Sequence, residues 1–226
     1  MIYNEFDGWC FIHIPKNAGS SVNNASFYGR NKALSNLGNI FPQENHVTRI
    51  QSKSDVRHNK WHYWRDEIPK GLRPIAIIRN PWARCVSIYL YNLKLAHRMS
   101  DQGWAQEDHP RLSYEGFRNS WMPGGFFVDG HAEEIEYSDS TGRAWSQSDQ
   151  QISWLSVNGT IVGDFYKLED EMPELCSRLN IQEMPWVNKT TEFDYEKYYQ
   201  NDEILINRIS ELFKDDIKFG KYEFSK

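Results

Sequence analysis

Residues 9–22 read Trp9-Cys10-Phe11-Ile12-His13-Ile14-Pro15-Lys16-Asn17-Ala18-Gly19-Ser20-Ser21-Val22. The stretch begins as an apolar run, breaks at a proline, passes a lysine and several small residues, and then has a helical pattern. A buried strand that turns into a helix through a tight loop leaves unpaired backbone N–H groups pointing at one spot, and the positive end of the helix acts at the same place. The pattern therefore predicts a loop that binds a phosphate or sulfate group.

The side chains of this loop support the same prediction. Lys16 adds a mobile positive charge, and Ser20 and Ser21 add hydroxyl donors. The loop does not have the Walker spacing G-x-x-x-x-G-K-[ST], because Lys16 precedes Gly19 and no upstream glycine stands in the required place. A P-loop-like kinase or another nucleotide enzyme is therefore the less favoured hypothesis.

A second stretch, residues 75–89, offers a partner for the first and reads IAIIRNPWARCVSIY. An apolar run again precedes a helical pattern, with Asn80 as the expected N-cap and a proline at the first helical position. Arg79 follows the run directly, at the carboxyl end of a strand, where open α/β sheets bind ligands. Arg84 and Ser87 lie three residues apart and so share a helix face.

Together the two stretches resemble the donor-binding motifs of the sulfotransferases. Residues 13–21 are similar to the family's 5′-phosphosulfate loop, most closely in the carbohydrate branch that includes the heparan sulfate 2-O-sulfotransferases. The segment from Arg79 to Tyr89 resembles the 3′-phosphate motif R-[DN]-P-x-x-R-x-x-S-x-Y. The motifs occur in the family's order, and weaker similarity covers most of the chain. Asn17 and Ser20 stand where threonine is usual, but both keep a polar side chain.

The resemblance implies that the donor is 3′-phosphoadenosine-5′-phosphosulfate (PAPS) and that the nucleotide product is 3′,5′-ADP. The residues expected to hold the 5′-phosphosulfate are Lys16, Asn17, Ala18, Gly19, Ser20 and Ser21. Arg79 and Ser87 are expected to hold the 3′-phosphate, since a fixed guanidinium fork matches phosphate oxygens. Lys16 is also expected to stabilise charge on the bridging oxygen. Arg84 either reaches the donor or braces its helix through an ion pair, and Tyr89 is expected in the core.

The resemblance also suggests a catalytic base. His46, in Asn-His-Val-Thr, is similar to the segment that carries the base histidine in the 2-O-sulfotransferase branch. Histidine suits this role because its ordinary pKa lies near working pH. His58, His62 and Glu44 are the alternatives, whereas His13 is expected to pack inside the first strand. No metal site is expected, because the chain has no H-E-x-x-H motif and sulfuryl transfer needs no metal.

Length and composition limit the remaining function classes. A chain of 226 residues suits a single domain over 1–226 that buries a sizeable core. The net charge of −5 argues against a protein that binds nucleic acids or membrane surfaces in general. The three cysteines have no metal or redox spacing, which indicates structural thiols in a reducing compartment. No signal peptide or membrane-spanning run is visible, so a soluble, cytoplasmic protein is expected.

The expected fold is a three-layer, P-loop-like α/β domain whose central sheet is mostly parallel and flanked by helices. Residues 1–8 are expected to lead into a strand at 9–14, and a further strand is expected near 73–78. Helices are expected at 19–28, 81–97, 145–155 and 202–214, and a strand leading into a helix at 159–179. The aromatic-rich segment 97–149 is expected to be an irregular insertion on the acceptor side.

These expectations describe a PAPS-dependent O-sulfotransferase that acts by in-line displacement with a histidine base. A carbohydrate hydroxyl is the favoured acceptor, among small-molecule and glycan acceptors. The alternative is a non-catalytic relative that kept the scaffold and binds the nucleotide. The sequence does not specify the acceptor, the oligomeric state or the residues that contact adenine.

Overall fold

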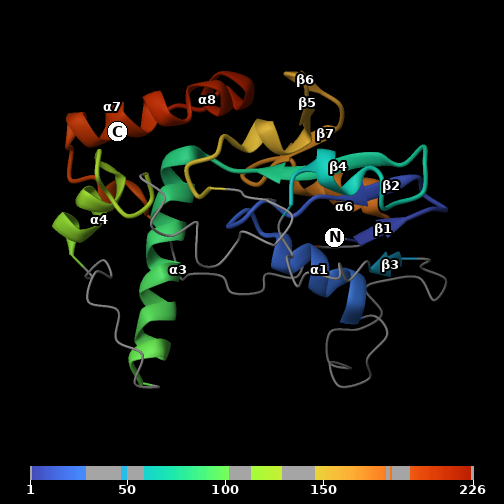
Figure 1. Ribbon diagram of the computed structural model, residues 1–226, viewed down its shortest axis with the longest axis horizontal. Coiled ribbons are helices and arrows are strands. Elements are labelled where there is room, and N and C mark those ends of the chain that lie inside the picture. The colour runs from blue at the N-terminus through green and yellow to red at the C-terminus, as the bar shows by residue number, and fades with distance from the viewer. Residues whose placement is uncertain are drawn as a thin grey trace. The chain divides into compact units, whose positions relative to one another are not determined.

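The computed structural model describes residues 2–28, 47–49, 59–101, 113–128, 146–181, 184 and 194–224. The chain divides into two compact units (Figure 1). The first unit comprises residues 1–79 and 151–191, and the second comprises residues 80–150 and 192–226. Each unit is built from two separate segments of the chain. The expectation of a single domain over 1–226 stays a prediction.

The first unit contains a five-stranded sheet with the order β3-β1-β2-β4-β7. The strands are β1 (Ile2–Asn4), β2 (Trp9–Phe11), β3 (Val47–Arg49), β4 (Arg73–Ile78) and β7 (Asp164–Lys167). β1 pairs antiparallel with both β2 and β3, whereas β2, β4 and β7 pair in parallel. Four strands of this sheet therefore run in one direction, which confirms the mostly parallel arrangement. The finer, P-loop-like classification stays a prediction.

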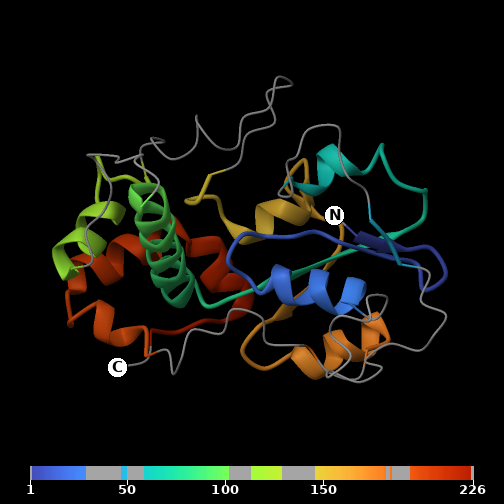
Figure 2. The same ribbon diagram turned by 90° about the horizontal axis from the view of Figure 1, so that it is seen from below.

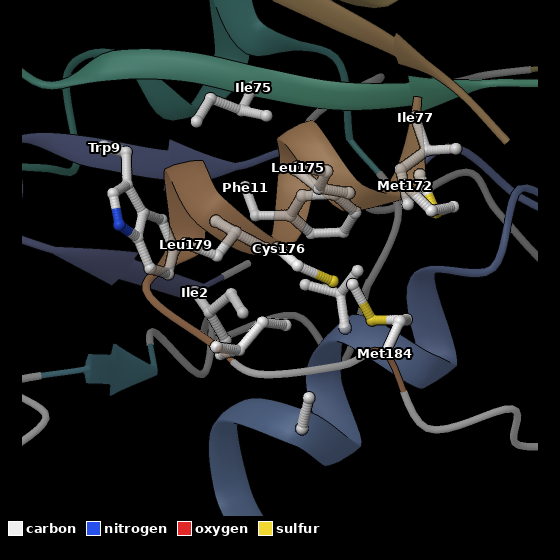
Figure 3. Close-up of a cluster of buried hydrophobic side chains, with 13 residues drawn as sticks. Ile2, Trp9, Phe11, Ile75, Ile77, Met172, Leu175, Cys176, Leu179 and Met184 are labelled. Atoms are coloured by element: carbon white, nitrogen blue, oxygen red, sulfur yellow. The ribbon is translucent and has the colours of Figure 1, made fainter. Parts of the chain in front are cut away.

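The central strands are buried on both faces, as a parallel sheet between helices requires. Successive side chains of a strand point to opposite faces, so Ile75 and Ile77 face one side of β4 and Ala76 and Ile78 face the other. All four are buried. Figure 3 shows Ile75 and Ile77 packed with side chains from β1, β2 and the helix α6. This cluster is the core of the first unit.

Helices cover both faces of the sheet in this unit (Figure 2). α1 (Gly19–Tyr28) and α6 (Met172–Leu179) lie on the face that carries the cluster of Figure 3. α2 (Trp61–Trp64) and the 3-10 helix η2 (Gln151–Leu155) lie on the opposite face. A small hairpin of β5 (Ser156–Val157) and β6 (Thr160–Ile161) follows η2. The expectation of a sheet flanked by helices is confirmed here.

The described part of the second unit is helical. Its helices are α3 (Pro81–Asp101), α4 (Tyr114–Trp121), η3 (Glu196–Tyr198), α7 (Glu203–Leu212) and α8 (Lys214–Gly220). Val86, Tyr89 and Leu93 form a buried stripe at helical spacing along α3 and belong to the core of this unit. Leu205 and Ile209 of α7 belong to the same core.

The helices expected at 19–28, 81–97 and 202–214 and the strand expected at 73–78 are confirmed, although α3 extends further than expected. Three boundaries were wrong. Residues 2–4 form β1 instead of a lead-in, and the strand β2 ends at Phe11 instead of continuing to residue 14. The helix expected over 145–155 is only the short η2. Three-residue strands and single 3-10 turns are too short to show a clear hydrophobic period. Their bounds depend instead on contacts with other parts of the fold.

The segment 97–149 is partly helical, because α4 lies within it. Its aromatic residues Phe117, Trp121 and Phe127 are almost completely buried in the core of the second unit. These rings therefore stabilise the unit and do not present a face to a sugar. The acceptor-side role of the segment stays a prediction, and Trp104 lies outside the described residues.

The three cysteines, Cys10, Cys85 and Cys176, are free thiols in buried positions, as expected. Burial raises the pKa of Cys10 to about 12, which keeps this thiol protonated at neutral pH. Within the described ranges, the helices are too short or too polar to cross a lipid bilayer. The cytoplasmic location stays a prediction.

Candidate functional site

The loop between β2 and α1 has an unusual backbone. Lys16 and Ala18 have φ values of 67° and 58°, in the left-handed region that residues with a Cβ rarely adopt. Backbone strain of this kind persists only where the surrounding structure imposes it, and it concentrates at functional sites. The loop predicted from the sequence is thus a tight, strained turn.

The turn leaves a group of backbone donors open. The N–H groups of Ser21 and Val22 both donate to the carbonyl of Ala18, at 2.8 and 3.3 Å, and these are the first bonds of α1. The N–H groups of Ala18, Gly19 and Ser20 have no acceptor among the residues that the structure describes. They are the orphan donors of a helix N-terminus, where the helix dipole also favours negative charge. An anion is the ligand that such a group suits best.

Gly19 is required at the start of α1 because His13 lies against it. A Cβ on Gly19 would lie 1.9, 2.2 and 2.5 Å from three atoms of the His13 ring. His13 is half-buried, and its Nδ1 lies 3.4 Å from the side-chain nitrogen of Asn23. His13 therefore packs beneath the loop, but it lies beyond the end of β2 instead of inside the strand as expected. The glycine lets the loop lie directly against the ring.

The cationic residues of the two predicted motifs meet at this loop. Lys16 is half-buried, and its carbonyl oxygen accepts a hydrogen bond from Nη1 of Arg79 at 3.4 Å. Arg79 directly follows β4, the strand that pairs in parallel with β2. Because the carboxyl ends of neighbouring parallel strands lie at one edge of a sheet, the sequence-distant Lys16 and Arg79 share that edge.

Gln151, which the sequence pattern did not indicate, connects Arg79 to the loop that contains Lys16. The side-chain amide of Gln151 donates to the carbonyl of Arg79 at 2.9 Å and accepts from its N–H at 2.9 Å. The same Gln151 oxygen accepts from the side chain of Asn17 at 2.5 Å, and Asn17 also donates to the carbonyl of Ile77 at 2.8 Å. The side chain of Asn17 is buried and supports the loop from inside. The expected role of Asn17 in binding the donor stays a prediction.

The loop serines differ in exposure. Ser20 is exposed, whereas Ser21 is buried. Ser20 is one of the residues with an open N–H group, whereas the N–H of Ser21 is bonded to the Ala18 carbonyl. The exposed position of Ser20 suits contact with a bound anion, and the expected contacts of both serines with the donor stay predictions.

The second motif continues into α3, within the second unit. The Oδ1 atom of Asn80 accepts from the N–H groups of Trp82 and Ala83 at 3.0 and 3.2 Å, so Asn80 is the expected N-cap. Ser87 is half-buried on α3. Its expected contact with the 3′-phosphate stays a prediction.

Arg84 and Tyr89 are structural residues of the second unit. Arg84 is completely buried, donates to the carbonyl of Asp149 at 3.3 Å and lies 5.7 Å from the ring centroid of Phe213. Burial lowers the pKa of Arg84, and the charge of Asp216 opposes this shift. The hydroxyl of Tyr89 bonds the backbone of Ser113, and Tyr89 is in the core as expected. These contacts favour the bracing role for Arg84.

The expected base cannot be placed in this site. His46, His58 and Glu44 lie outside the described residues. His62 lies in α2, where burial lowers its pKa and the nearby charges of Lys60 and Arg65 lower it further. A lowered pKa keeps this imidazole neutral near pH 7. The role of His46 stays a prediction from the sequence.

Comparison with known proteins identifies one family. A model of the sulfotransferase family matches residues 1–223, which include both motifs, the whole first unit and the second unit except its last three residues. Neither the curated proteins nor the solved structures that were searched contain a match. The family match therefore covers the whole site described above.

Proposed function

Because this chain belongs to the sulfotransferase family, we propose that it transfers a sulfuryl group from PAPS to a hydroxyl group of an acceptor. The family itself supports sulfuryl transfer in general. PAPS as the donor follows from the resemblance of the two motifs to the family's 5′-phosphosulfate and 3′-phosphate motifs. A carbohydrate is the proposed acceptor, because the loop resembles that of the carbohydrate branch most closely.

The observation that carries this proposal is the meeting of Arg79 with the Lys16 loop. Lys16 and the open N–H groups of residues 18–20 would hold the 5′-phosphosulfate. Arg79, whose guanidinium group lies at the Lys16 carbonyl, would hold the 3′-phosphate with its donor fork. Ser87 is assigned to the 3′-phosphate on the motif alone. A doubly phosphorylated nucleotide matches two cationic groups beside one set of backbone donors.

The proposed reaction is an in-line displacement at sulfur. The acceptor oxygen forms a bond to sulfur while the bond from sulfur to the bridging oxygen of the donor breaks, and 3′,5′-ADP leaves. His46 would take the proton of the acceptor hydroxyl, and Lys16 would stabilise the charge that develops on the bridging oxygen. As in phosphoryl transfer, the protein contributes mainly by positioning and charge stabilisation.

An acceptor screen with radiolabelled sulfate donor tests this function. Wild-type protein is expected to label at least one hydroxyl acceptor, and Lys16→Ala is expected to lose that labelling. Lys70→Ala is the matched control, because Lys70 is an exposed lysine of the same unit, in a turn before β4. Equal labelling by Lys16→Ala and wild type would contradict the proposed role of the loop.

Thermal shifts separate the alternatives, because a ligand that binds the native state raises the melting temperature. We expect 3′,5′-ADP to raise the Tm more than ATP does, whereas a P-loop-like kinase would show the reverse. We also expect His46→Ala to keep the shift with 3′,5′-ADP and to lose the sulfated product. A wild-type protein that binds 3′,5′-ADP and sulfates no acceptor would be the non-catalytic relative.

A further inference from the structure

Gln151, the first residue of η2, is completely buried beside the donor loop. Both ends of its side-chain amide bond the main chain of Arg79, at 2.9 Å each. Its oxygen also accepts from Asn17, at 2.5 Å. One side chain thus ties the residue that follows Lys16 to the residue that follows β4.

Gln150, the preceding residue, makes the same kinds of bonds in a different place. Its amide nitrogen donates to the Asp215 carboxylate at 2.9 Å, and its oxygen accepts from the N–H groups of Asp215 and Asp216 at 2.9 and 3.3 Å. These bonds hold the first turn of α8 in the second unit. The two glutamines are equal in size and chemistry, so each serves as the control for the other.

We propose that Gln151 is a positioning residue that fixes Arg79 relative to the Lys16 loop, and this inference depends on the proposed function. Gln151 does not need to touch the nucleotide, because it acts through Asn17 and the backbone of Arg79. Its amide provides an acceptor for the Arg79 N–H and a donor for the Arg79 carbonyl, at the residue directly after the end of β4. Arg79 is thereby held with its side chain at the Lys16 carbonyl.

The physical reason is the cost of unpaired buried groups. Without the Gln151 amide, the N–H and carbonyl of the half-buried Arg79 and the amide of the buried Asn17 each lose a partner. Polar groups in that position regain partners by moving toward water. Movement of Arg79 would change the spacing between the groups proposed for the 3′-phosphate and for the 5′-phosphosulfate. That change would weaken the binding of a nucleotide with both phosphates more than the binding of a nucleotide with one.

Isothermal titration of Gln151→Met and Gln150→Met with 3′,5′-ADP and 5′-AMP tests this inference. The measurement is made at a temperature where circular dichroism shows each variant to be folded. Gln151→Met is expected to weaken 3′,5′-ADP binding about ten-fold and 5′-AMP binding only about two-fold, as the loss of a few buried hydrogen bonds allows. Gln150→Met is expected to lower the Tm and to leave both affinities unchanged.

Gln151→Glu provides a second variant in case the methionine variant does not fold. A carboxylate keeps the acceptor for Asn17 and for the Arg79 N–H but cannot donate to the Arg79 carbonyl. An intermediate loss, about three-fold for 3′,5′-ADP, is expected. Unchanged binding in the folded Gln151 variants, or an equal loss for both nucleotides, would overturn the positioning role and leave the proposed function intact. A wild-type protein that does not bind 3′,5′-ADP would overturn both.

Discussion

Helices α1 and α3 each come after a strand of the same sheet in the sequence. The two helices differ in whether a side chain accepts hydrogen bonds from the N–H groups of the first turn. At α3, Asn80 accepts from two N–H groups of the first turn. At α1, the residue before the helix is Ala18, which has no side-chain acceptor, and the N–H groups of residues 18–20 have no partner within the described ranges. A good N-cap contributes about 1 kcal/mol of stability. The start of α1 lacks that stabilisation, as expected of a helix end that binds an anion.

Backbone conformation separates the two helix starts further. Two residues of the loop before α1, Lys16 and Ala18, are in the left-handed region, whereas no residue from 79 to 81 has a positive φ. A proline at the first helical position of α3 is already suited to the helix. The start of α3 is therefore stabilised by its cap and its proline. The start of α1 has a strained backbone and open N–H groups to which a ligand would bind.

The largest expected effect is at Lys16. We expect Lys16→Ala to lower the turnover of sulfuryl transfer by about 100- to 1,000-fold, as is typical when a group that stabilises transition-state charge is removed. The Tm should change little, because Lys16 is half-exposed. Initial rates with saturating donor measure the effect, with Lys70→Ala as the control. A rate within a few-fold of wild type would remove the main functional difference between the two helix starts.

The close contact between Gly19 and His13 gives the next effect. We expect Gly19→Ala to reduce the free energy of unfolding by about 1–3 kcal/mol, because the new Cβ would overlap the His13 ring. Urea denaturation measures this change. The double variant His13→Ala with Gly19→Ala makes room for the methyl group and should recover part of the stability lost by Gly19→Ala. No recovery in the double variant would show that the ring contact is not the cause.

The start of α7 is capped by a charged side chain, that of Asp202. Asp202 accepts from the N–H of Leu205, the hydroxyl of Tyr114 and the guanidinium of Arg118. Burial alone would raise the pKa of Asp202, but these hydrogen bonds outweigh it and lower the pKa from 3.8 to about 2. A lowered pKa stabilises the fold above the unfolded-state value, and this stabilisation is lost as the pH falls toward 2.

Acid denaturation checks this assignment. The free energy of unfolding is expected to fall by about 1–2 kcal/mol from this group alone between about pH 5 and about pH 2. Asp202→Asn should be less stable at neutral pH and should show a shallower decline with acid. Asp66→Asn, which alters an exposed carboxylate, is the control and should leave the pH profile unchanged. A wild-type slope retained in Asp202→Asn would contradict the charged cap.

The smallest effect is expected at the start of α3. Asn80→Ala should reduce the free energy of unfolding by about 1 kcal/mol through loss of the cap, and Asn80→Ser should restore most of it. Thermal denaturation measures both variants. The cap makes α3 stable without a ligand, so we expect 3′,5′-ADP to bind folded Asn80→Ala almost as well as wild type. A loss of affinity as large as that of Lys16→Ala would show that the two helix starts are not functionally distinct.

The features that sequence could predict are those encoded locally. An apolar run identified β4, helical patterns identified α1 and α3, and Asn80 was identified as a cap from its position before a proline. The loop around Lys16 was recognised because proline, lysine and small residues stand between a strand and a helix. Local patterns therefore predicted these elements and the position of the loop between β2 and α1, whereas anion binding by the loop stays a prediction.

The features that sequence missed depend on partners distant in the chain. Gln151 is an ordinary polar residue before an apolar turn, and its role is visible only once Asn17 and Arg79 lie beside it. β1 is three residues long and is defined by its pairing with β2 and β3. The sequence likewise did not show which separated segments combine into each compact unit. Tertiary contacts of this kind leave little trace in local periodicity.

A crystal structure of the protein with 3′,5′-ADP tests the central claim most directly, because that claim concerns where two phosphates bind. The 5′-phosphate is predicted to contact the N–H groups of residues 18–20 and the Lys16 ammonium, with the 3′-phosphate on the Arg79 guanidinium. A nucleotide bound elsewhere, or one whose 3′-phosphate does not contact Arg79, would contradict the account.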